Sequence, residues 1–390
     1  MKTEMARILR AIPGYEERIL DLKETLIANL VMISEIPAPT FKEHERRDFI
    51  IERFNQGGLQ NCSTDEIGNA LGILPGEEGD RNILIVAHLD TVFNNKVDHT
   101  VTVHPDQVIG PGVADNAMGV SALVTLPIVL EHLNIRLKSN LILMGTARSL
   151  GRGDIAGLRF FLSNSDIPIS MGLCIEGVKL GRLSYYSIGM MRCEISCQVP
   201  EQYDWTRFGA VGSVVTLNKV INRILGIPLP RRPRTNIVLG MIEGGTSFDT
   251  VATRADLKFE IRSESAKLVR QVGQQIESIA EEVAALTEAE VNYKVFAQRK
   301  PGGIKFSHPL ASNARTIIKQ LGIKPWISPS TSELAAFIAH RIPAITLGLT
   351  DGANLGKPDE TIEIAPISKG IAQLAGLILA IDRGCCDEHK

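Results

Sequence analysis

An apolar run that ends in a histidine and an aspartate constrains the fold of this chain more than any other feature. Residues 83–87 read Ile-Leu-Ile-Val-Ala and lead into His88-Leu-Asp90, and a glycine-rich turn at 110–114 leads to Asp115. An uncharged run of this kind is typical of a buried strand in an α/β sheet. Such sheets place their ligands beyond the carboxyl ends of the strands. A histidine and two carboxylates at that edge form a ligand set that suits zinc, so the sequence predicts a metal site there.

The size and composition of the chain indicate a globular protein of two domains. Its 390 residues are too many for one ordinary core. Apolar residues make up 44% and charged residues 22%, which is typical of soluble proteins. The net charge is −2 and no basic stripe is present, so no nucleic-acid partner is expected.

We expect neither a membrane-spanning segment nor a signal peptide in this chain. Its apolar runs stop short of the ~18 residues that a membrane-spanning helix needs, and the N-terminal residues lack an apolar signal-peptide core. The six cysteines form no Cys-x-x-Cys pair. Reduced thiols without a role, in a cytoplasmic protein, are therefore expected.

Two regions differ in their patterning. Residues 1–182 and 299–390 alternate strands with helices, which predicts an α/β layer with a largely parallel sheet. Residues 183–298 have the β-α-β-β-α-β order of a ferredoxin-like unit, and they form the predicted insert. The predicted strands of the α/β layer are 69–74, 82–88, 139–145, 171–176 and 343–348, and its helices are 117–133, 154–163, 309–321, 332–340 and 366–382, with helical periodicity over 14–57. In the insert, strands are predicted at 183–199, 235–242, 254–262 and 290–296, and helices at 209–225 and 265–287.

Several motifs, in this order, resemble the co-catalytic zinc exopeptidases and deacylases, such as peptidase T, carboxypeptidase G, and acetylornithine and succinyl-diaminopimelate deacylases. His88-Leu-Asp90 and Gly112-Val-Ala-Asp115-Asn116-x-x-Gly119 match the two metal-ligand motifs of that family. The further segments that resemble it are Glu243 to Asp249, Asp256 to Arg262, Thr331-Ser332-Glu333 and Ile342-Pro343 to Gly348. The resemblance covers nearly the whole chain. It implies a catalytic-type domain with a mixed sheet flanked by helices, interrupted by a ferredoxin-like dimerisation domain, and a homodimer that pairs edge strands.

The resemblance also implies roles for the metal-site residues. The family chemistry uses two cations bridged by one carboxylate, with a glutamate that takes a proton from the water. His88, the bridging Asp115 and Glu176 would hold the first cation. Asp90 would hydrogen-bond the His88 ring and fix its tautomer. The alternative for His88 is a strand-end histidine whose ring is satisfied by a turn.

The other half of the family site is missing from this sequence. The family motif Thr-x-x-Glu-Glu is replaced by Thr146-Ala-Arg148-Ser149-Leu150, so the general base is absent at Ser149 and a ligand of the second cation is absent at Leu150. The family's C-terminal histidine falls on Gly356. A histidine usual in the inserted domain is also absent from 200–205.

These losses change the electrostatics of the site. A unit charge ~4 Å from a dication contributes several kcal/mol at an effective dielectric of ~20. A second cation without its carboxylate and imidazole, and with Arg148 and Arg152 nearby in sequence, should therefore not bind. The sequence predicts at most one zinc ion per chain. A chain that binds no zinc ion is also compatible with it.

The residues beside this gap have two interpretations each. Arg148 and Arg152 are either a solvated pair or an anion pocket at a helix N-terminus. Asp154 is expected to cap a helix rather than to replace the base.

Three acidic or basic residues elsewhere also have alternatives. Glu333 and Glu360 are candidate substitute acids, but a helix-start or surface position is favoured for each. Arg262 resembles the family residue that meets a substrate carboxylate, or it pairs with an acid such as Glu264.

Three functions remain open on the sequence. The first is a hydrolase of small peptides or N-acyl amino acids with impaired or one-metal catalysis. The second is a non-catalytic protein that binds a small ligand, and the third is a structural dimer. Fold resemblance alone does not decide among them, because function depends on the site.

Overall fold

The computed structural model describes residues 2–204, 206 and 211–388. The chain divides into two compact units, Met1–Ser187 with Gly303–Lys390, and Ile188–Gly302. Residues 200–205 are the segment in which the histidine expected of the inserted domain is absent. Its last residue, Trp205, lies outside the described residues. The predicted helix start at Gly209 also lies outside them.

The first unit is built on a mixed eight-stranded sheet of order β1-β2-β6-β3-β7-β16-β8-β15. Strand β3 runs parallel to β6 and β7, and β7 runs parallel to β16. Strands β1 and β2 pair antiparallel at one edge, which confirms the predicted mixed α/β class. The strands are β1 (Gln60–Thr64), β2 (Ala70–Leu74), β3 (Asn82–His88), β6 (Asn140–Thr146), β7 (Met171–Val178), β8 (Arg182–Ser184), β15 (Trp326–Ile327) and β16 (Ala344–Thr350).

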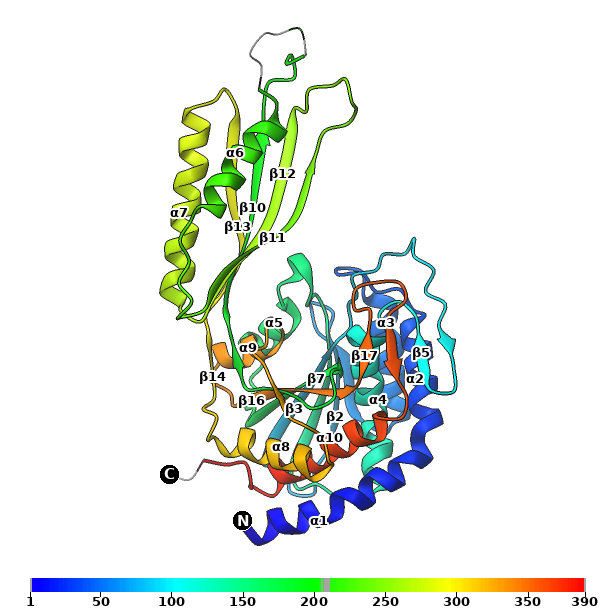
Figure 1. Ribbon diagram of the computed structural model, residues 1–390. Helices are drawn as coiled ribbons and strands as arrows, with labels where there is room; N and C mark the ends of the chain where they lie inside the picture. Colours follow the sequence, from blue (N-terminus) through cyan, green and yellow to red (C-terminus); the bar gives the residue numbers. More distant parts are fainter. Residues whose placement is uncertain (1, 205, 207–210, 389–390) are drawn as a thin grey trace. The chain divides into compact units, whose positions relative to one another are not determined.

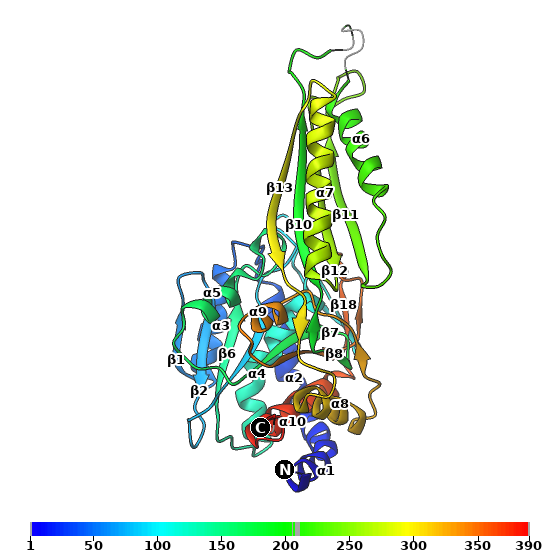
Figure 2. The same ribbon diagram turned by 90° about the vertical axis from the view of Figure 1, so that its left-hand side faces the viewer.

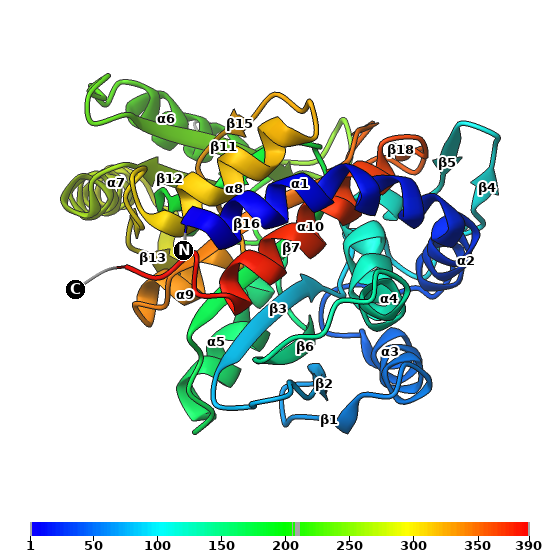
Figure 3. The ribbon, with the colours of Figure 1, turned by 90° about the horizontal axis from the view of Figure 1, so that it is seen from below.

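Helices cover both faces of this sheet because its central strands are apolar on both sides. In β3, Ile83 and Ile85 enter a core shared with helices α1, α2, α4, α8 and α10. Leu84 and Val86 enter a second core with α5 and α9. Figure 3 shows α1, α8 and α10 side by side on the first of these faces. The helices are α1 (Lys2–Ile19), α2 (Lys23–Ser34), α3 (His44–Gln56), α4 (Met118–His132), α5 (Ala156–Asn164), α8 (Pro309–Gln320), α9 (Leu334–Ala339) and α10 (Ile367–Asp382).

Two small sheets accompany the large sheet (Figure 1), and one of their strands, β14, lies at the chain boundary of the first unit. One has the order β17-β18-β5-β4 and the other pairs β14 with β9. Their strands are β4 (Thr102–Val103), β5 (Gln107–Ile109), β9 (Tyr186–Ser187), β14 (Gly302–Gly303), β17 (Gly352–Ala353) and β18 (Thr361–Glu363).

The second unit is an antiparallel sheet of order β11-β12-β10-β13 with two helices. Figure 2 shows both helices against the sheet, and they share one core with its inner face. The elements follow the predicted β-α-β-β-α-β order: β10 (Gly189–Gln198), α6 (Ser213–Leu225), β11 (Thr235–Gly244), β12 (Arg254–Ser263), α7 (Ala266–Ala285) and β13 (Glu290–Arg299).

Two predicted elements differ from the structure. The single strand expected over 183–199 is wrong, because it breaks into β8, β9 and β10, which belong to three different sheets. Its apolar pattern continues across these breaks, so periodicity could not show the change of partner. The first helix begins at Lys2, well before the periodicity recognised from residue 14.

One helical stretch, Val113–His132, is long and apolar enough to cross a membrane by length and composition. Within the structure, 89% of its most apolar 18-residue window is buried. A core helix of a globular domain passes the same test, and α4 packs against the central sheet.

Candidate metal centre

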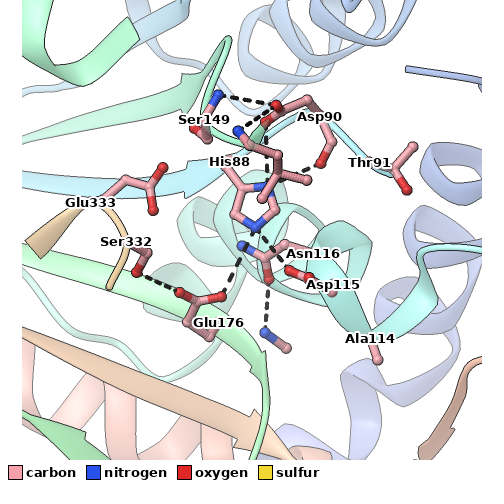
Figure 4. A network of polar contacts seen from close by, with 12 residues as sticks. His88, Asp90, Thr91, Ala114, Asp115, Asn116, Ser149, Glu176, Ser332 and Glu333 are labelled. Atoms are coloured by element: carbon pink, nitrogen blue, oxygen red, sulfur yellow. Dashed lines mark hydrogen bonds and ion pairs between the residues drawn. The ribbon is translucent and has the colours of Figure 1, made fainter. Parts of the chain in front are cut away.

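Strand alternation brings the polar side chains of the candidate site to one face of the sheet. Thr146 is the parallel partner of His88, and Val86 is the partner of Cys174, so His88 and Glu176 each lie two residues further along. Residues two apart in a strand point to the same side. His88, Thr146 and Glu176 therefore share the face covered by α5 and α9, at the carboxyl ends of β3, β6 and β7. Figure 4 shows His88 and Glu176 side by side.

Three predicted ligands come together at this edge. One ligand atom each from His88, Asp115 and Glu176 lies within 4.8 Å of the other two. His88 Nε2 is 2.9 Å from Asp115 Oδ1 and 4.0 Å from Glu176 Oε2. His88 and Glu176 are buried, whereas Asp115 remains partly open to solvent. One imidazole nitrogen with two carboxylate oxygens fits the donor set of a catalytic-type zinc ion.

The orientation of His88 favours metal binding through Nε2. Its Nδ1 lies 3.0 Å from the main-chain oxygen of Asp90 and 3.5 Å from the Asp90 carboxylate, so the carbonyl is the closer acceptor. A proton on Nδ1 leaves the Nε2 lone pair for a cation. Burial opposes protonation of His88, but the hydrogen bonds to Asp115 and Asp90 outweigh it and raise its pKa well above the usual value. A bound cation must therefore displace a proton from Nε2.

Asn116 fixes Asp115 relative to Glu176. Its amide donates to the Ile175 carbonyl at 2.8 Å and accepts from the Gly177 N–H at 2.8 Å, on either side of Glu176. A Cβ at Gly119 would collide with the Asn116 side chain, which explains the glycine of this motif. The loop before α4 and strand β7 are thus held together around the two carboxylates.

Glu360 supports the same loop. The prediction that favoured a helix-start or surface position for Glu360 is wrong. Its side chain is buried, and Oε2 accepts the N–H groups of Ala114 at 3.1 Å and Asp115 at 3.2 Å. Oε1 accepts the N–H of Gly356 at 2.7 Å. Burial, with a smaller contribution from Asp115, raises the pKa of Glu360 to about 7.

We expect Glu360→Ala to destabilise the protein by about 2–4 kcal/mol, because it leaves three loop N–H groups without their acceptor. Thermal unfolding should show a lower midpoint, and zinc affinity should fall because the Asp115 loop is loosened. Glu363→Ala is the matched control, since that exposed glutamate ends the same strand, β18. Equal midpoints for the two variants would show that Glu360 does not hold the loop.

The loop after β6, where the sequence resemblance predicts that two glutamates are replaced, turns its backbone toward Asp90. The N–H groups of Ser149 and Leu150 donate to Asp90 Oδ2 at 3.0 and 2.8 Å, and the Thr40 hydroxyl donates to the same oxygen at 2.8 Å. Burial raises the pKa of Asp90, but His88 and these donors outweigh it and leave the pKa lowered. Asp90 is therefore an ionised, buried acceptor that anchors this loop.

The Arg148 side chain lies over an aromatic ring. The Arg148 guanidinium lies 5.7 Å from the centre of the Phe41 ring, and its main-chain N–H donates to Glu43. Arg152 is exposed in the short helical turn Gly151–Gly153. The expected helix cap at Asp154 is wrong: Ile155 occupies the N-cap of α5, and Asp154 pairs with Arg159 at 2.7 Å.

Arg182 and Ser332 flank Glu176, and sequence reasoning missed both contacts. Arg182 Nη1 lies 3.9 Å from Glu176 Oε1, and the Ser332 hydroxyl donates to that oxygen at 2.9 Å. Burial raises the pKa of Glu176, and Arg182 and His88 partly offset this effect. No motif marks Arg182, and only its place in β8, beside β16 and near β7, brings it to the site.

Gly356, the predicted position of the missing histidine, adopts a left-handed conformation with φ 76°. Arg262 lies in the second unit and pairs with an acid, as one of its two interpretations expected, but the acid is Glu260 at 2.6 Å and not Glu264. Glu260 and Arg262 are two apart in β12 and point to the same face of the sheet.

Comparison with known proteins shows which family this chain resembles. The model of peptidase family M20/M25/M40 matches residues 84–380. No curated protein sequence matches the chain.

Among solved structures, the di-peptidase Dug1p from Saccharomyces cerevisiae superposes with a TM-score of 0.79 at 13% identity, over 96% of this chain and 99% of that chain. The aminopeptidase PepT from Bacillus cereus gives 0.69 at 18% identity, over 92% and 98%. A dinuclear metal-binding peptidase of family M20 from Bacillus subtilis gives 0.65 at 15% identity, over 93% and 99%. At these identities the likeness shows a shared fold. With a family model that matches most of its length, the chain belongs to peptidase family M20/M25/M40.

Proposed function

We propose that this protein is a metal-dependent hydrolase of small peptides or N-acyl amino acids that works slowly with a single zinc ion. The observation that carries this proposal is the asymmetry of the site. His88, Asp115 and Glu176 bring their ligand atoms within 4.8 Å, whereas the family resemblance of the sequence assigns the other cation's own ligands to the positions of Leu150 and Gly356.

The residues present define what the site can do. When bound, zinc polarises a carbonyl and lowers the pKa of water. Asp115 is the most exposed of the three ligands. Arg182 and Ser332 hold Glu176 in place, and Asp90 fixes the tautomer of His88 through its carbonyl. These contacts orient His88 and Glu176 before a cation arrives.

A second cation is disfavoured by charge. Beside the bridging Asp115 it would meet an apolar side chain at Leu150 and a glycine at 356. The Arg182 guanidinium, 3.9 Å from Glu176, already supplies positive charge to this cluster. Two like charges a few ångströms apart repel by several kcal/mol at an effective dielectric of ~20.

A homodimer in a reducing cytoplasm is part of the proposal. Strand β11 is an edge strand of the second unit, and it exposes Val238, Met241 and Ile242. Exposed apolar edge strands tend to pair with another chain. All six cysteines are free, which suits a reducing compartment. Light scattering that gives the monomer mass at micromolar concentration would contradict the dimer.

The function is tested with the purified full chain, loaded with zinc and assayed on dipeptides and N-acetyl amino acids. We expect slow hydrolysis of at least one compound, and its loss when a chelator removes the zinc. A zinc-loaded protein that shifts its unfolding temperature with these compounds but hydrolyses none would instead be a binding protein. A protein that neither retains zinc nor responds to them would refute the proposal altogether.

A further inference from the structure

A buried carboxylate that has no part in the three-ligand cluster lies beside the position of the missing base. Glu333 is only 2% exposed and occupies the N-cap position of α9. Its side chain does not cap the helix. Instead, Glu333 Oε1 accepts a hydrogen bond from the Thr146 hydroxyl at 3.5 Å.

Thr146 connects this carboxylate to Ser149. The two hydroxyl oxygens, Thr146 Oγ1 and Ser149 Oγ, are 3.2 Å apart. The Thr146 hydroxyl donates its one proton to Glu333, so in the contact between the two hydroxyls Ser149 is the donor and Thr146 the acceptor. The three side chains are at least nine-tenths buried, and the chain of hydrogen bonds ends at the residue that replaces the family's general base.

The strand alternation that places His88 and Glu176 on one face of the sheet also places Thr146 on that face. Thr146 is the direct partner of His88 across β3 and β6, and both project to the α9 face of the sheet. Ser332, the neighbour of Glu333, donates to Glu176. In Figure 4, Ser149 lies above the His88 ring and Glu333 lies to its left.

We propose that Ser149, Thr146 and Glu333 form a hydroxyl relay that replaces the missing general base, with Glu333 as the final proton acceptor. This inference rests on the proposed hydrolase function. A water molecule gives one proton to Ser149 Oγ while Ser149 passes its own proton to Thr146 and Thr146 passes its proton to Glu333. The hydroxide adds to the amide carbonyl carbon. The proton then returns along the same hydroxyls to the leaving nitrogen as the C–N bond breaks, so one water and one amide give an acid and an amine.

The relay predicts a specific pattern of kinetic effects. Positioned proton acceptors contribute about 10²–10⁴-fold to rate. Glu333→Gln and Thr146→Val should each lower kcat at least ~100-fold with KM little changed. Because both act through one relay, the double variant should lose no more than either single variant, whereas independent structural defects would multiply.

Two further measurements separate a relay from a loss of packing. Thr346→Val is the matched control, because Thr346 is a buried threonine on the same face, beside the Cys174 thiol; it should keep wild-type kcat. In a Ser149→Glu background the carboxylate stands at the base position itself, so Glu333→Gln should no longer lower kcat. Zinc content and unfolding temperature of every variant should match those of its parent.

The outcomes distinguish the relay from the function on which it rests. Wild-type kcat in Glu333→Gln overturns the relay and leaves the hydrolase standing. Loss of zinc from Glu333→Gln would make Glu333 a ligand and also overturns it. A zinc-loaded wild-type chain that hydrolyses no compound of the panel overturns both, and multiplicative losses in the double variant overturn the relay alone.

Discussion

Replacing His88 with alanine is expected to abolish tight zinc binding, with at least ~100-fold weaker affinity. His88 supplies the one nitrogen of the cluster, and loss of a residue that only supports a ligand already costs 10–100-fold. The substitution also leaves Asp115 and Glu176 as neighbouring carboxylates without the imidazole, which favours their protonation over metal binding. Competition with a zinc chelator measures the affinity directly.

The matched control for this variant is His132→Ala, which removes a half-buried histidine that pairs with Asp21. Zinc binding should remain at the wild-type level there. Because the pKa of His88 is raised, a proton competes with zinc at this nitrogen, and wild-type affinity should fall as pH is lowered. Unchanged zinc content in His88→Ala would show that the cluster is only a structural remnant.

Restoring the missing groups is expected to have the second large effect. The triple variant Ser149→Glu, Leu150→Glu and Gly356→His should bind a second ion and raise kcat at least ~100-fold, since a general base alone contributes 10²–10⁴-fold. A Cβ atom at Gly356 would meet nothing within 4 Å, so the backbone there leaves room for a side chain to begin. The left-handed conformation there costs about 1–2 kcal/mol for a non-glycine residue, which the ion must offset.

The control for the triple variant is Ser149→Gln, Leu150→Gln and Gly356→Asn, which adds similar bulk and the same backbone strain without carboxylates or imidazole. It should bind one ion and keep slow turnover. If the restored variant folds with wild-type stability but still binds a single ion, the missing ligands are not what excludes the second one.

Much of the fold and half of the site follow from local sequence. The apolar run before His88 determines a buried strand, and its alternation of side chains already assigns His88 to one face. The Asp115-Asn116-x-x-Gly119 motif could be recognised because each of its residues acts on its immediate neighbourhood. The glycine makes room for the asparagine that clamps β7.

The supporting contacts could not be predicted because they depend on distant pairings. Glu360 reaches the Asp115 loop only because β18 pairs antiparallel with β5, and both strands are three residues long, too short for any periodic signal. Arg182 and Glu333 reach the site in the same way, through strand order and helix placement. A surface assignment for Glu360 was reasonable from composition, and burial by tertiary structure overrode it.

The number of zinc ions bound per chain tests the central claim most directly. The full-length protein is saturated with zinc, freed of loosely bound metal on a desalting column and analysed for metal and protein. One ion per chain, lost in His88→Ala, is the result we expect if His88, Asp115 and Glu176 form the whole metal site, as proposed from the replacement of the other ligands at Leu150 and Gly356. Two tightly held ions per chain would contradict it.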